Sequence, residues 1–114
     1  PLSCAAALAT INIIESEGLL KRAEVLGKRI MAGLEKELSS VSHVKNIRGM
    51  GCMIGIELDR PCKSLFKTAM DNGLVINVTA DSVIRLLPPL ILTDEEADKL
   101  LAILVPLIRD FNQD

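Results

Sequence analysis

An apolar segment at the start of the chain most constrains what the chain can fold into. Nearly every side chain of residues 2–14 is apolar or small, and a helix that is apolar around its whole girth normally lies between other elements. A chain of 114 residues has little with which to surround such a helix. We therefore expect residues 1–16 to form an interdomain type of helix that packs against something outside this chain. The start at Pro1 rather than Met looks like a cut inside a larger protein.

The next segments change from a helical to an extended period. Residues 19–38 place apolar side chains three and four positions apart, which lays one apolar stripe along an amphipathic helix. In residues 52–58 apolar residues alternate with others, as in a half-buried strand. Residues 44–47 supply a partner strand, joined through a tight turn at residues 48–51.

The second half of the chain repeats this alternation. A short helix follows Pro61, and Asn72-Gly73 is a left-handed stop for it. Residues 74–78 and 83–87 are predicted strands, and Pro88 ends the second because proline donates no ladder hydrogen bond.

The last helix has the clearest start signal. Thr93 and Glu96 have the spacing of a capping box, and the apolar residues that follow form one face. Pro106 lies inside this pattern and removes a hydrogen bond to the Ala102 carbonyl, so we expect a kink or a local break there.

This order of elements predicts the fold class. Short strands joined by tight turns, with helices gathered on one face, make an α+β sandwich of two layers with a small, mostly antiparallel sheet. The length and a hydrophobic content of 49% suit one domain over residues 1–114.

Composition excludes several classes of function. The net charge is −2 and the basic residues are dispersed, which argues against nucleic-acid binding. No apolar run is long enough to cross a bilayer, and the first residues lack the basic start and apolar core of a signal peptide, so we expect no membrane partner. The three scattered cysteines, Cys4, Cys52 and Cys62, fit neither a disulfide framework nor a metal site and suit a reducing compartment, which we take to be the cytoplasm.

Arg85 is the most informative polar residue. It interrupts an apolar run, residues 83–87, that otherwise is typical of a strand buried on both faces. A guanidinium is rarely buried without a carboxylate or phosphate partner. On spacing alone two interpretations stay open. In the first, Arg85 is structural: it forms an internal ion pair, for example with Glu57, or lies on an exposed edge strand. In the second, it binds an anionic ligand.

Other candidate residues have simpler interpretations. His43 is the one histidine, so no catalytic dyad or metal cluster can be built around it, and we expect it in a surface loop. Cys4 and Cys52 are expected to be small buried hydrophobes and Cys62 to be exposed. None of the seven lysines is a convincing Schiff-base lysine.

These segments together resemble the C-terminal part of the class III, fold-type-I aminotransferases, which use pyridoxal phosphate. The resemblance extends over essentially the whole chain. The stretch Arg-Gly-x-Gly-x-Met-x-Gly-Ile-Glu-Leu at residues 48–58 marks the class. The stretches Asn-Val-Thr-Ala-Asp at residues 77–81 and Arg-Leu-Leu-Pro-Pro-Leu at residues 85–90 are similar to members that act on N-acetylornithine.

The resemblance implies a role for Arg85. In the class, the arginine before Leu-Leu-Pro-Pro holds the carboxylate of the amino-acid substrate and of 2-oxoglutarate, and Arg85 is the matching residue. The catalytic lysine and the cofactor contacts belong to a large domain upstream of Pro1, so we expect no catalytic, cofactor-binding or metal-binding residue in this chain, and no pyridoxal phosphate bound to it alone.

The resemblance further implies a homodimer that transfers the amino group of N-acetylornithine to 2-oxoglutarate in arginine biosynthesis. Ornithine, succinylornithine and 4-aminobutyrate are other amino donors within the class. A different hypothesis is a stand-alone α+β module that binds a small ligand or a partner protein.

Overall fold

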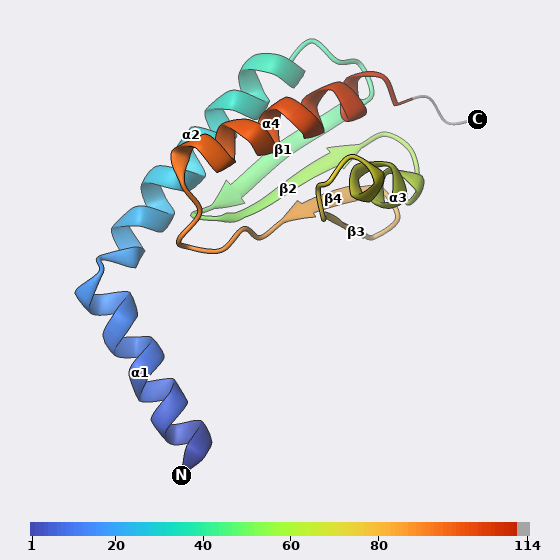
Figure 1. Cartoon of the computed structure of the whole chain (residues 1–114). Helices are drawn as coiled ribbons and strands as arrows, with labels where there is room; N and C mark the ends of the chain where they lie inside the picture. The colour runs from blue at the N-terminus through green and yellow to red at the C-terminus, as the bar shows by residue number, and fades with distance from the viewer. Residues whose placement is uncertain (112–114) are drawn as a thin grey trace.

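A computed structural model describes residues 1–111, which form four helices and four strands (Figure 1). In chain order they are α1 (Leu2–Ser16), α2 (Leu19–Leu38), β1 (Val44–Met50), β2 (Met53–Leu58), α3 (Ser64–Asp71), β3 (Asn77–Thr79), β4 (Val83–Leu86) and α4 (Asp94–Arg109).

The strands make one antiparallel sheet in the order β1-β2-β4-β3. The β1–β2 hairpin turns at Gly51, which has a φ of 53° and therefore suits glycine. Two layers result, with α2 and α4 side by side over one face of the sheet (Figure 1). This arrangement confirms the predicted α+β class.

The core lies between α2, α4 and the covered face of the sheet. Alternate residues of β2 and β4 face it, and the predicted stripe of α2 faces it from the other side. On the outer side of the two helices, Arg22 pairs with Asp94 at 2.7 Å and Arg29 pairs with Asp98 at 2.8 Å. The largest fully buried aliphatic side chains are Leu26, Ile30, Leu34, Leu38, Ile54, Ile56, Leu58, Ile84, Leu104 and Ile108.

Helix α1 projects away from this body (Figure 1). It has no buried residue, and its apolar side chains, such as Leu8 and Ile11, lie exposed. Gly18, with a φ of 62°, separates it from α2. The rest of the described chain therefore does not cover this helix.

The third strand is shorter than predicted and begins later. The sequence pattern indicated a strand over residues 74–78, whereas β3 spans Asn77–Thr79. The amide of Leu74 donates to the Ala69 carbonyl at the end of α3, and Ile76 is buried in the core. Leu74 and Ile76 therefore pack against the core without strand pairing, whereas Val75 between them is exposed.

The sequence predicted a kink or a local break of the last helix at Pro106. No break is present, because α4 continues through Pro106 to Arg109. Pro106 and Ala102 both lie on the exposed side of the helix. Water can therefore hydrogen-bond to the Ala102 carbonyl, which lacks its usual amide partner.

We predict that Pro106→Ala stabilises the chain, because it restores one amide donor to an exposed helix position. The free energy of unfolding should rise by about 1 to 2 kcal/mol, below the full helix penalty of proline because the helix already accommodates it. Urea denaturation measures this change. An unchanged or lower value would show that the proline ring makes contacts worth more than the missing hydrogen bond.

Candidate functional site

Arg85 lies in β4, an inner strand of the sheet, where its pairing places it in a row of four residues. Its partners are Gly55 on β2 and Asn77 on β3, and Arg48 on β1 is the partner of Gly55. The residues on either side of Arg85 in the strand are buried under the helices, so its side chain leaves the opposite, open face. The strand is therefore buried on one face, and the prediction that it is buried on both faces was wrong.

The Arg85 guanidinium makes no hydrogen bond or ion pair with any residue of the described range 1–111. Glu57, the acidic partner considered for it, instead accepts a hydrogen bond from Arg48 at 2.6 Å. The other structural interpretation, an exposed edge strand, does not hold either, because β4 lies between β2 and β3. The described structure thus contains no internal partner that accounts for Arg85.

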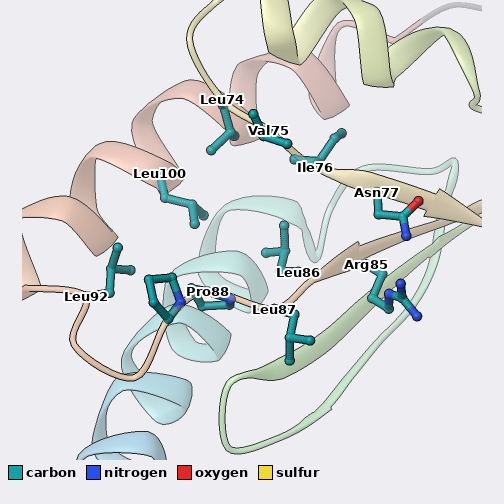
Figure 2. Close-up of a pocket in the computed structure, with 11 residues that line it drawn as sticks. Leu74, Val75, Ile76, Asn77, Arg85, Leu86, Leu87, Pro88, Leu92 and Leu100 are labelled. Carbon is teal, nitrogen blue, oxygen red and sulfur yellow. The ribbon is translucent and has the colours of Figure 1, made fainter. Parts of the chain in front are cut away.

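One groove beside Arg85 is mainly apolar. It has a volume of about 350 Å³ and lies between β4, the segment before β3, and α4 (Figure 2). Asn77 and Arg85 lie together at one end of it, and Leu100 of α4 lies toward the other end (Figure 2). Its lining residues are Leu74, Val75, Ile76, Asn77, Arg85, Leu86, Leu87, Pro88, Pro89, Leu92 and Leu100.

A second groove, of about 340 Å³, crosses the open face on the other side of Arg85. Gly55 has no side chain to fill it, and Arg48 lies beyond Gly55 in the same row. Its lining residues are Arg48, Gly49, Met50, Met53, Ile54, Gly55, Thr79, Val83 and Arg85. Arg85 lines both grooves and therefore lies where they meet.

This arrangement suits the binding of a carboxylate. A planar guanidinium can donate two parallel hydrogen bonds to one carboxylate, which fixes its orientation as well as its position. The Asn77 side chain, which has no hydrogen-bond partner within residues 1–111, lies next to Arg85 on the same face and offers a further amide donor. Both grooves lead away from Arg85, and either offers room for the carbon chain of such a ligand.

The lysines do not contribute to either groove. Four of them have acidic partners within 3 Å on the surface, such as Lys63 with Asp81 at 2.6 Å. The residues present therefore do not fit a pyridoxal-phosphate site, which needs a lysine amine beside the substrate.

In the described part of the chain, no group of three or more His, Cys, Asp or Glu could hold a metal ion. None of the described helices combines the length and apolar character needed to cross a membrane.

His43 is buried, so the prediction of a surface loop histidine was wrong. Its Nε2 atom lies 2.7 Å from the Ile108 carbonyl oxygen of α4. This contact fastens the loop before β1 to the last turns of α4, and a buried imidazole with a backbone partner is a structural feature.

The cysteine predictions hold for one residue of three. Cys52 is buried in the β1–β2 turn, where its thiol lies 3.7 Å from the Ala23 carbonyl oxygen of α2. Cys4 is exposed because α1 is uncovered, and Cys62 is buried against the core rather than exposed. Burial raises the pKa of the Cys52 and Cys62 thiols, which lowers their reactivity.

Comparison with known proteins relates nearly the whole chain to one enzyme family. The family model described as aminotransferase class-III matches residues 1–108. The chain is 56% identical over 111 residues to acetylornithine aminotransferase 1 of Bordetella bronchiseptica, covering 97% of this chain and 28% of that protein. It is 41% identical over 110 residues to acetylornithine aminotransferase of Methanothermobacter thermautotrophicus, covering 96% of this chain and again 28% of the relative.

Solved structures show the same fold. The acetylornithine aminotransferase of Elizabethkingia anophelis matches with a TM-score of 0.86 and 32% identity, over 97% of this chain and 30% of that one. An ornithine aminotransferase of Toxoplasma gondii, described with pyridoxal phosphate (PLP) at its active site, matches with a TM-score of 0.87 and 32% identity, over 93% of this chain and 26% of that one. The chain thus spans less than a third of the length of these relatives.

Proposed function

The chain belongs to the class-III aminotransferase family, and we propose that it is the C-terminal small domain of a pyridoxal-phosphate-dependent aminotransferase, in which Arg85 binds the substrate carboxylate. The observation that carries this proposal is an arginine without an internal partner, placed where two grooves meet on the open face of the sheet. In this role the domain binds and orients the substrate.

The proposed reaction transfers the amino group of N-acetylornithine to 2-oxoglutarate, as in arginine biosynthesis. Support for this substrate comes from the acetylornithine aminotransferases among the relatives and from their coverage of nearly the whole chain. Both substrates carry an α-carboxylate. A single guanidinium can therefore hold the amino donor and the oxo acid in turn, with the α-carbon at the same place.

The cofactor belongs, in this proposal, to a large domain outside this chain. PLP supplies the electron sink for amino-group transfer, and the grooves beside Arg85 contain no lysine that could hold it. The chain alone should therefore be inactive. A homodimer and a cytoplasmic location complete the proposal, the latter supported by three cysteines without a disulfide.

Helix α1 supports the assignment to a larger protein. An isolated helix with exposed Leu8 and Ile11 leaves apolar surface that a neighbouring domain would cover. We propose that residues 1–16 form the connection to that domain.

We predict that the purified 114-residue chain self-associates through α1 and, mixed with PLP, shows no absorbance band of a lysine-bound cofactor. Leu8→Glu and Ile11→Glu together should shift sedimentation toward the monomer without changing urea denaturation, because both side chains lie outside the core. A wild-type chain that is monomeric and carries a tightly bound small ligand would instead support a stand-alone binding module.

A further inference from the structure

Gly55 has neither a left-handed backbone nor a close contact that would account for a glycine within the described residues 1–111. Of the seven glycines, three have a left-handed backbone, which favours glycine. Three others would place a Cβ within 3.0 Å of a neighbouring atom. The first set is Gly18, Gly51 and Gly73, and the second is Gly27, Gly33 and Gly49.

Neither reason applies to Gly55. Its φ lies outside the left-handed region. A Cβ at this position would meet the Val83 Cγ1 atom at 3.6 Å and the Arg48 Cγ atom at 3.9 Å, which are ordinary contact distances. The fold therefore has room for a side chain at Gly55, on the open face of the sheet.

A glycine inside a strand weakens it, because glycine loses more chain entropy on folding and contributes no side chain to packing. Gly55 lies in the interior of β2, with β1 on one side and β4 on the other. Where the fold does not demand such a glycine, the usual reason is the close approach of a ligand or of another backbone.

Arg85, the neighbour of Gly55 on β4, indicates that a ligand approaching Gly55 carries a carboxylate. Gly55 pairs with Arg85, and the second groove lies over both of them. Strands lie about 4.8 Å apart, so a side chain on residue 55 would stand directly beside the arginine side chain. Arg48 is neutralised by Glu57 in this groove, whereas Arg85 has no acidic partner within the described range.

We infer that Gly55 is a specificity-determining position of the substrate site: its missing side chain makes room for the carbon chain of the amino acid or oxo acid whose carboxylate Arg85 holds. This inference rests on the proposed function. It adds that the substrate crosses the sheet on the β2 side of Arg85, above Gly55, where the size of residue 55 limits what can bind.

Gly55→Ala and Gly55→Val in the complete aminotransferase test this inference. We expect the Michaelis constants for N-acetylornithine and 2-oxoglutarate to rise with side-chain size, by about threefold for alanine and about tenfold or more for valine, from crowding of a packed contact. Urea denaturation should show equal or greater stability, because alanine and valine both suit a strand better than glycine. Bound PLP should be unchanged.

Asn46→Val is the matched control. It adds a β-branched side chain to β1, at the far edge of the same sheet, and Asn46 lines neither of the two grooves. Its Michaelis constants should equal those of the unchanged enzyme.

The outcomes separate the two levels of the hypothesis. If Arg85→Ala leaves both Michaelis constants unchanged, the proposed function fails and the inference with it. If Arg85→Ala weakens the substrates while both Gly55 variants bind them normally, the inference alone is wrong. Loss of stability in both Gly55 variants would also overturn it, because the glycine would then be required by packing against another part of the protein.

Discussion

Arg85→Ala in the complete aminotransferase is expected to raise the Michaelis constants for the amino donor and for 2-oxoglutarate by about ten- to a hundredfold. A hydrogen bond to a charged group is worth about 1.5 to 3 kcal/mol, which corresponds to this range. Both substrates should be affected because both present a carboxylate to the same guanidinium. Steady-state kinetics with each substrate varied in turn measure the effect.

The structure indicates that this variant should still fold. Arg85 makes no hydrogen bond or ion pair inside the described chain and its side chain lies exposed, so urea denaturation should change little. Arg85→Lys keeps the charge but loses the planar fork, and it should recover part of the binding. The intermediate value would distinguish bidentate recognition from attraction by charge alone.

Arg109→Ala is the matched control for the loss of an exposed arginine. Arg109 lies at the end of α4, where it pairs with Glu37 of α2 at 3.0 Å, away from the open face of the sheet. Its removal should leave both Michaelis constants unchanged. If Arg85→Ala behaves like Arg109→Ala, Arg85 does not bind the substrate carboxylate.

Local signals in the sequence predicted most of the secondary structure. The capping box at Thr93 is present, with the Glu96 amide donating to the Thr93 hydroxyl at 3.1 Å. The stripe of α2 and the alternation in β2 also correspond to buried faces. Such patterns depend on residues within one or two turns, so the sequence alone contains them.

Long-range contacts explain where the sequence predictions were wrong. His43 is buried because the Ile108 carbonyl, far along the chain, lies beside it. Cys62 is buried because its surroundings come from distant elements of the core. Neither neighbour can be identified from local periodicity.

The candidate site shows the same division. Arg85 could be selected from the sequence because a charge in an apolar run is unusual. The sequence did not show that Asn77 and Gly55 lie beside Arg85, because the strand order β1-β2-β4-β3 and the pairing register decide which residues lie in one row. The last glycine of the Arg-Gly-x-Gly-x-Met-x-Gly motif was the available signal for Gly55. Explaining why a glycine stands there requires the positions of the neighbouring atoms.

Gly27→Ala is expected to destabilise the chain strongly, because α2 touches the β1–β2 turn at this residue. A Cβ on Gly27 would lie 2.0 Å from the Gly51 carbonyl oxygen and 2.5 Å from its carbonyl carbon. Both atoms belong to backbone, so helix and turn must separate. We expect a loss of about 2 to 3 kcal/mol, the upper range for overpacking, even after the roughly 1 kcal/mol that alanine contributes to a helix.

Gly33→Ala is the control within the same helix. Its Cβ would lie 2.4 Å from the Leu101 Cδ1 atom, the end of a flexible side chain that can turn aside. The helix propensity of alanine then offsets the rearrangement, and the free energy of unfolding should stay within about 1 kcal/mol of the original. Urea denaturation of both variants provides the comparison. Equal stabilities would contradict the close backbone contact between Gly27 and Gly51. They would also contradict the conclusion that α2 holds the β1–β2 turn in place ahead of β2 and Gly55.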